Sequence, residues 1–167
     1  MNKIFLTILI IIVYEIIICF VRKIKRRIYY KRAVQRAKET NKKLLIIGDP
    51  YNGIASIITG LDYGCGDICV DITGCPKCEM GIKDKLENYL PTINLNDYII
   101  YISCVLEYTS DLPLIESYLD KVPPQNLFVV NVEWYSLMAY FYPFFLTGEQ
   151  PPKYIKGPSG KYFKNFV

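Results

Sequence analysis

Residues 42–53 read KKLLIIGDPYNG, and this stretch decides the fold class of the 167-residue chain. Four consecutive aliphatic residues, 44–47, are followed by Gly48 and by a loop of turn-forming residues. A short apolar run without polar alternation is typical of a strand that is buried on both faces of a parallel sheet. The stretch therefore predicts a buried strand with a glycine-containing loop at its carboxyl end.

Three similar runs follow, rich in the β-branched and aromatic residues that favour strands: residues 66–72 (GDICVDI), 97–105 (DYIIYISCV) and 126–132 (NLFVVNV). Segments with helical spacing lie between the runs, at residues 54–59, 82–90 and 112–122. Strands that alternate with helices predict an α/β fold, here a Rossmann-like, mostly parallel sheet with flanking helices. We assign this fold to a domain over residues 43–167.

Two C-terminal segments are expected to complete the domain. The aromatic stretch at residues 134–146 is either a helix packed on the sheet or a segment lying on a membrane surface. In residues 153–166 a GPSG turn separates two tyrosine-containing runs, which predicts a hairpin.

Residues 4–21, IFLTILIIIVYEIIICFV, predict a membrane anchor. Fourteen of these eighteen residues are Ile, Leu, Val or Phe, and as a helix they cover a hydrocarbon core of about 30 Å. Their summed insertion free energy of about −6 kcal/mol exceeds the cost of about 3 kcal/mol for Glu15. A cleaved signal peptide is the alternative, but RKIKRR stands where a small-residue cleavage site would be. We expect a transmembrane helix over residues 1–21, with Glu15 either paired with a partner in the membrane or, as is favoured, protonated and without a role.

Charge is divided unevenly along the chain. Residues 22–43 carry eleven Lys or Arg and one acid, a net charge of +10, whereas residues 44–167 carry −6. Because the basic excess follows the anchor, the positive-inside rule predicts a single-pass membrane protein with its C-terminal domain in the cytoplasm. A basic juxtamembrane helix over residues 22–42 is expected to contact anionic lipid headgroups, and no nucleic-acid partner is favoured.

Four of the six cysteines gather in two pairs, Cys65-x3-Cys69 and Cys75-x2-Cys78. Four thiolates can bind one tetrahedral zinc ion, CPKC alone can act as a redox pair, and buried cysteines can serve as small apolar residues. The apolar role is favoured, because Cys69 falls inside a predicted strand and the pairs are close together for a zinc ribbon. We assign no metal ligands, and zinc remains a cofactor that is considered but not favoured.

Polar and glycine residues stand where the predicted strands end. In doubly wound sheets, ligands bind beyond the carboxyl ends of the strands. The candidate cofactor-binding residues at these ends are Gly48, Asp49 and Gly53 after the first strand, Asp71 at the end of the second, and Ser103 in the third.

These motifs resemble those of the class I S-adenosylmethionine-dependent methyltransferases. LLIIGDPYNG (44–53) is similar to the glycine-rich first motif, DICVDI (67–72) to the second, and DYIIYISCVLEYTSDL (97–112) to the third. The resemblance implies that S-adenosylmethionine binds at the candidate residues, with its ribose hydroxyls on Asp71. It also implies that residues 126–132 are strand five and that the terminal hairpin adds strands six and seven. The chain also looks like small membrane-anchored methyltransferase-like proteins of large DNA viruses.

Three departures from this family pattern stand out. The first motif carries two glycines, Gly48 and Gly53, where active members usually have three small residues. The interval from Asp71 to Asp97 is short, so a helix–strand pair is expected to be compressed or missing. The chain contains no histidine and no D/N-P-P-Y motif, so no catalytic residue is predicted.

The sequence thus predicts a membrane-anchored methyltransferase-like protein that binds S-adenosylmethionine and transfers its methyl group to an unidentified acceptor. A first alternative is a non-catalytic membrane or virion component that uses a degenerate methyltransferase fold to contact membrane or virion proteins. A second alternative is a small cysteine-ligated zinc module.

Overall fold

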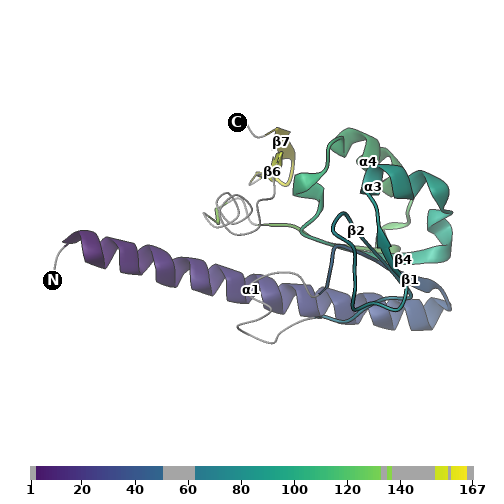
Figure 1. Ribbon diagram of the computed structural model, residues 1–167, viewed down its shortest axis with the longest axis horizontal. Coiled ribbons are helices and arrows are strands. Elements are labelled where there is room, and N and C mark those ends of the chain that lie inside the picture. The colour runs from purple at the N-terminus through teal and green to yellow at the C-terminus, as the bar shows by residue number, and fades with distance from the viewer. Residues whose placement is uncertain (1–2, 51–62, 133–134, 137–152, 158, 165–167) are drawn as a thin grey trace.

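A computed structural model of the chain describes residues 3–50, 63–132, 135–136, 153–157 and 159–164. Within these residues a parallel five-stranded sheet has the order β3-β2-β1-β4-β5. The strands are β1 (Lys43–Ile47), β2 (Ile68–Asp71), β3 (Gly81–Lys83), β4 (Tyr98–Ser103) and β5 (Leu127–Val130). Helices lie on both faces of this sheet (Figure 1), so the predicted α/β fold with an N-terminal helix is confirmed.

Strand β1 is the central strand, as its uninterrupted apolar sequence predicts. Leu45 pairs with Ile68 of β2 on one side and with Ile100 of β4 on the other. Leu45 and Ile46 are completely buried, because helices cover both faces of the sheet at this position.

Helix α1 (Lys3–Thr40) is continuous through the apolar and the basic segments. It ends where Asn41 adopts a φ of +52°, a left-handed conformation that asparagine tolerates better than most residues. The Lys42 N–H donates to the Ala37 carbonyl (3.1 Å), and the Asn41 N–H donates to the Lys38 carbonyl (3.4 Å). These two bonds form a Schellman cap, and the chain then turns directly into β1.

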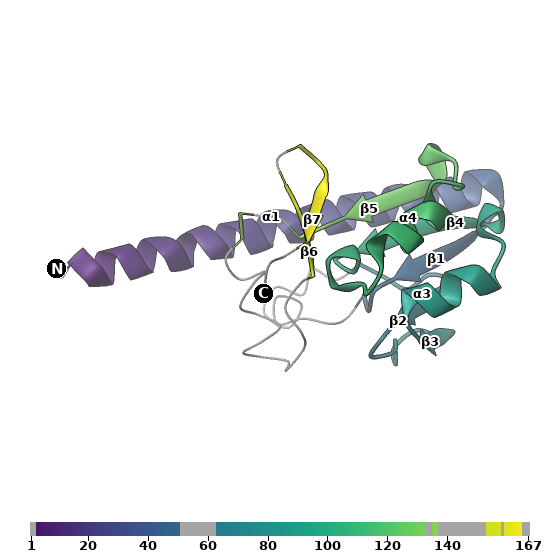
Figure 2. The same cartoon turned by 90° about the horizontal axis from the view of Figure 1, so that it is seen from above.

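The C-terminal half of α1 packs on one face of the sheet, alongside β4 and β5 (Figures 1 and 2). Ala33 is completely buried and Ala37 nearly so, and their small side chains let the helix approach the strands closely. The basic segment of the helix therefore also contributes to the core of the domain. The domain boundaries after residues 21 and 42 stay predictions.

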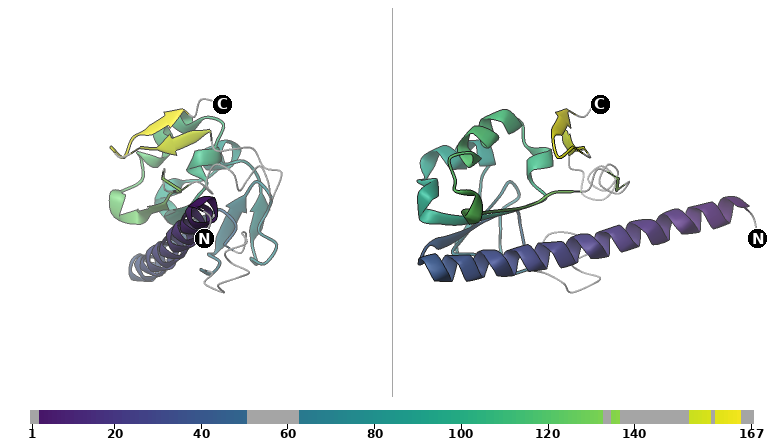
Figure 3. Two further views of the ribbon diagram at one scale, coloured as in Figure 1. Left: turned by 90° about the vertical axis from the view of Figure 1, so that its left-hand side faces the viewer. Right: turned by 180° about the vertical axis from the view of Figure 1, so that it is seen from behind.

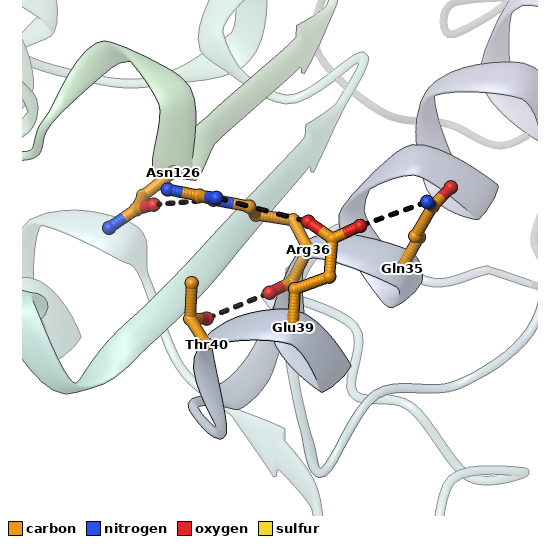
Figure 4. A network of polar contacts seen from close by, with 5 residues as sticks. All are labelled: Gln35, Arg36, Glu39, Thr40 and Asn126. Carbon is orange, nitrogen blue, oxygen red and sulfur yellow. Dashed lines mark hydrogen bonds and ion pairs between the residues drawn. The ribbon is translucent and has the colours of Figure 1, made fainter.

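A polar network fixes the end of α1 to the turn before β5 (Figure 4). Arg36 Nε donates to Oδ1 of the buried Asn126 (3.4 Å), and the Arg36 guanidinium also pairs with Glu39 (3.8 Å). Gln35 donates to the same glutamate (2.9 Å), while the Thr40 hydroxyl donates to the Arg36 carbonyl (2.7 Å).

The opposite face of the sheet is covered by α3 (Leu86–Tyr89) and α4 (Leu112–Leu119) (Figure 3). Helix α4 confirms the helix predicted from residue 112, and its N-cap is Asp111, whose carboxylate accepts from the Leu114 N–H (3.1 Å). Short 3₁₀ turns make the remaining connections: η1 (Leu90–Thr92), η2 (Leu95–Asp97), η3 (Leu106–Tyr108) and η4 (Pro124–Asn126).

The helix predicted at residues 82–90 is wrong in its first part. Residues Gly81–Lys83 form the edge strand β3, and α3 begins only at Leu86. The helical spacing is real for the buried Leu86 and Leu90, but Ile82 lies beside β2, where Val70 is its register partner. The compression expected between Asp71 and Asp97 is thus present, because a short strand and one helical turn occupy this interval.

The terminal hairpin is confirmed, with β6 (Tyr154–Lys156) antiparallel to β7 (Tyr162–Lys164). It forms its own two-stranded sheet, so the placement as strands six and seven of the main sheet is wrong. The Lys153 N–H donates to the Glu107 carbonyl (2.7 Å), and Tyr154 and Tyr162 pack against the core. These contacts hold the hairpin beside η3 instead of along β5.

Within the described residues, α1 is the one helix long and apolar enough to cross a membrane. Its N-terminal end extends beyond the sheet (Figure 1), and most aliphatic side chains of its N-terminal half are exposed, although Ile18 is buried. Glu15 is nevertheless buried, because Ser136 packs against it and donates a hydrogen bond to its carboxylate (3.0 Å). Glu15 thus has a hydrogen-bond partner in the same chain, whereas the sequence favoured a residue without a role.

Candidate functional site

The sheet order places a topological switch point between β1 and β4. The connection from β1 leads to β2 on one side, and β4 continues to β5 on the other. In open α/β sheets this divergence leaves a crevice beyond the carboxyl ends of the strands, where ligands bind. Gly48 follows β1 and Ser103 ends β4, so both predicted residues lie at this point.

The backbone has positive φ angles on both sides of the switch point. Gly48 has a φ of +104°, and a Cβ there would lie 2.9 Å from the Ser103 carbonyl oxygen and 3.0 Å from the Val105 side chain. Cys104, just after β4, has a φ of +55°, which costs a non-glycine residue about 1–3 kcal/mol. Glycine is therefore required at position 48 by conformation and by space.

Asp71 ends β2 beside the loop that leaves β1. Its Oδ2 accepts from the Asp49 N–H (3.1 Å), and its Oδ1 accepts from the N–H (2.8 Å) and the hydroxyl (2.6 Å) of Thr73. A carboxylate has about four acceptor positions. Three are filled from within the chain, so Asp71 is oriented by the protein and keeps one position for a ligand donor.

Four of the five predicted cofactor-binding residues come together at this edge of the sheet. Gly48 and Asp49 lie between Asp71 and Ser103, as the hydrogen bond to Asp71 and the close approach to Ser103 show. Ser103 is buried, and the atom that lies next to Gly48 is its backbone carbonyl oxygen. The fifth residue, Gly53, lies outside the described residues, as does the helix predicted at 54–59. The stretch 134–146 is described only at residues 135–136.

A cleft of about 330 Å³ opens further along the same edge, at the end of β5. Its walls come from α1, from the chain after β5 and from the terminal hairpin, with Lys25, Tyr29, Asn131, Tyr135 and Lys156 among the lining residues. The ammonium groups of Lys25 and Lys156 would attract an anionic ligand to this cleft. The Asn131 Oδ1 is buried and has no hydrogen-bond partner among the described residues, so it could accept from a ligand donor.

The paired cysteines converge on the α1 face of β2. Cys65 and Cys78 form a disulfide, and the Sγ atoms of Cys65, Cys69 and Cys78 all lie within 4.8 Å of one another. The Cys75 thiol hydrogen-bonds to Cys69; this bond lowers the pKa of Cys69 and, with burial, raises the pKa of Cys75. Cys69 points into the packing, as predicted from its place in a strand, but the packing at this position consists of the other cysteines.

Residues that the sequence did not single out also lie near the site. Tyr63 stacks edge-on against Tyr101, with ring centroids 5.0 Å apart, and its hydroxyl accepts from Arg26 (3.1 Å). Burial alone would lower the pKa of Arg26, but its interactions with Tyr63, Cys104 and Tyr101 together outweigh burial and raise this pKa. Cys104 and Asn131 stand at the ends of predicted strands, but the positive φ of Cys104 and the unfilled acceptor of Asn131 have no residue pattern that the sequence could show. The sequence did not single out Arg26, because it is one of eleven basic residues in the run 22–43.

Comparison of the chain with protein families, with curated proteins and with solved structures found no match. The structure alone establishes the architecture of the chain, which is an N-terminal apolar helix and a parallel sheet compatible with an α/β fold.

Proposed function

We propose that the switch-point edge binds S-adenosylmethionine and that the chain is a membrane-anchored methyltransferase-like protein. The observation that carries the proposal is the placement of Asp71. Asp71 is the last residue of β2, and its carboxylate accepts a hydrogen bond from the Asp49 N–H. Asp49 comes directly after Gly48, the glycine that follows β1. A nucleoside that entered the switch-point crevice would meet the open acceptor position of this carboxylate with a ribose hydroxyl.

Gly48 supports the same ligand. The positive φ of Gly48 turns the chain sharply after β1 and places the Asp49 N–H beside Asp71, at the edge where a cofactor would bind. The described residues of the site offer no evident general base, and the whole chain contains no histidine. Methyl transfer can proceed mainly by positioning of the methyl donor against the acceptor, so this composition is compatible with catalysis.

A non-catalytic role is the second candidate, and the three internal hydrogen bonds of Asp71 favour it. A carboxylate that binds both hydroxyls of a ribose needs two open acceptor positions, and Asp71 has one. The Thr73 hydroxyl would therefore have to turn away from Asp71. A carboxylate that serves only to order the loop after β2 needs no such change. In this case the fold would present a surface for a membrane or virion protein.

The two roles differ in ligand binding. The test is calorimetric titration of the full chain in lipid nanodiscs with S-adenosylmethionine and, separately, with its demethylated product. We expect saturable binding of both, with a Kd in the micromolar to millimolar range. Absence of binding at millimolar ligand by a folded chain would exclude the cofactor and leave the non-catalytic role.

A further inference from the structure

The connection from β2 to β3 lacks the element that normally covers a parallel crossover. Parallel neighbours are usually joined by a dozen or more residues that include a helix. Residues 72–80 make the connection here, with turns and bends and without a helix over that range. The α1 face of β2 at this place is covered by the cysteine-containing segments 63–66 and 75–78.

The backbone is closely packed where these segments meet the sheet. A Cβ at Gly81 would overlap the carbonyl of Cys75, and a Cβ at Gly66 would overlap the carbonyl of Leu44. The Cys69 N–H donates to the Met80 carbonyl (2.9 Å), which brings the end of the connection back beside β2. The two glycines therefore allow the loop to fold onto the middle of β2, where the Cys69 side chain is buried.

This folding gathers a sulfur cluster, which we define as Cys65, Cys69, Cys75 and Cys78. Three of its Sγ atoms, those of Cys65, Cys69 and Cys78, lie within 4.8 Å of one another, and the fourth member, Cys75, is buried in the same core cluster. Three members are buried and Cys65 is half-buried, so bulk water has little access. The Gly66 N–H also points at the Cys69 sulfur (3.5 Å), a contact that favours a thiolate at this position.

We propose that one Zn²⁺ ion binds the reduced sulfur cluster and holds the β2–β3 connection on the sheet. Four thiolates in two short-spaced pairs are a preferred zinc ligand set, with Zn–S distances of about 2.3 Å. In a tetrahedron of that size the sulfurs stand about 3.8 Å apart, which is comparable to the spacing of at most 4.8 Å among Cys65, Cys69 and Cys78, and Cys75 would move in as the fourth ligand. A loop without a helix and with few apolar side chains needs such a cross-link.

The disulfide between Cys65 and Cys78 represents the oxidised form of this site. A cytoplasmic domain, as the charge pattern predicts, would meet dithiol reductants that keep such thiols reduced. Exchange with a dithiol transfers two electrons and two protons to the Cys65–Cys78 disulfide and leaves the reductant as a disulfide. Zinc binding by four thiols then releases four protons. The reverse reaction, in which an oxidant takes two electrons from two ligand thiolates, would release the ion.

The test is metal analysis of the full chain, purified in detergent without chelator and in the presence of a dithiol. We expect one zinc ion per chain and loss of this zinc in Cys69→Ser and Cys75→Ser. Cys19→Ser and Cys104→Ser are matched controls that should retain it, because these cysteines lie outside the cluster. Zinc-free, folded wild-type protein under these conditions would overturn the proposal, and so would equal zinc loss in the control variants.

A cobalt titration tests the site without any variant. Co²⁺ added to the reduced, metal-free wild type should give the intense visible absorption of a tetrahedral thiolate site, and a disulfide-forming oxidant should abolish it. The weak spectrum of octahedral cobalt would overturn the proposal even if the serine variants do not fold. Neither readout depends on S-adenosylmethionine, so failure here and failure of the proposed function can be told apart.

Discussion

Tyr101 in β4 donates its phenolic hydroxyl to the backbone carbonyl oxygen of Arg26 in α1, with 3.1 Å between the two oxygens. The tyrosine is completely buried, and the ring of Tyr63 contacts both its ring and the Arg26 guanidinium. The helix that carries the apolar N-terminal segment is thus bonded to the centre of the sheet. This hydrogen bond helps to fix the orientation of α1 relative to the sheet.

Truncation should show that the basic half of α1 belongs to the folded domain. A chain that begins at Arg22 keeps Arg26, Ala33 and Ala37 and should unfold cooperatively. A chain that begins at Lys42 loses all three and exposes the α1 face of the sheet, so it should be aggregated or readily cleaved by protease. Circular dichroism and limited proteolysis of both chains measure this. Equal stability of the two chains would contradict the role given to α1.

A larger side chain at Ala33 should separate the helix from the sheet. Ala33 is completely buried, and overpacking of such a site costs about 1–3 kcal/mol. We expect Ala33→Leu to lower the free energy of unfolding by this amount in denaturant titrations. Lys31→Leu makes an apolar change on the exposed side of the same helix and should cost less than about 0.5 kcal/mol. Similar values for both variants would speak against close packing of α1.

Gly48→Ala and Gly74→Ala form a pair that separates steric overlap from backbone strain. Both glycines have positive φ, +104° and +90°. A Cβ at Gly48 would press on the Ser103 carbonyl at 2.9 Å, whereas one at Gly74 would meet the Lys83 side chain at an ordinary 3.5 Å. Each variant should lose about 1 kcal/mol from strain, and Gly48→Ala should lose more. Thermal unfolding measures the difference, and a Gly74→Ala effect as large as that of Gly48→Ala would contradict this geometry.

The stability of the domain should fall in acid partly because of Glu87. Burial alone would raise the pKa of its carboxyl, but hydrogen bonds from the Ser110 and Asp111 N–H groups outweigh this and lower it. A lowered pKa in the folded state gives stability above the unfolded value of about 4.3, which is lost as the pH falls through the folded pKa. Glu87→Gln should therefore flatten the decline in unfolding midpoint between about pH 5 and 2. The same change at exposed Glu79 is the control, and an unaltered pH profile in Glu87→Gln would refute the assignment.

Much of the fold could be predicted because each main strand is an unbroken apolar run. Strands β1, β2, β4 and β5 all lie inside the predicted segments, since burial on both faces leaves no polar alternation to confuse the pattern. The edge strand β3 was missed because it has only three residues, of which Gly81 and Lys83 are exposed and Ile82 is half-buried, so it carries no such signal. The hairpin was predicted from its turn, but its separation from the main sheet depends on contacts with Glu107 and the core that lie far away in sequence.

The candidate site was partly predictable, because the predicted strands also fix where their carboxyl ends lie. Gly48, Asp71 and Ser103 stand at strand ends, and parallel strands bring their carboxyl ends to one edge. The convergence of the cysteines was not predictable, because it depends on a crossover without a helix that folds Cys75 and Cys78 back over Cys69. Spacing alone left a four-thiolate site, a redox pair and an apolar role open, and the three-dimensional arrangement brings the two pairs together.

The most direct measurement of the proposed function is the affinity for S-adenosylhomocysteine of the wild-type chain and of Asp71→Asn, both in nanodiscs. The asparagine keeps an acceptor oxygen for the loop but removes the charge that strengthens a bond to a ribose hydroxyl. We predict Kd at least about tenfold higher in Asp71→Asn, since a charge-assisted hydrogen bond contributes about 1.5–3 kcal/mol. Asp120→Asn, an exposed change at the end of α4, should leave Kd unchanged. Equal affinity in the wild type and Asp71→Asn, or no binding by either, would contradict the nucleoside site at the switch point.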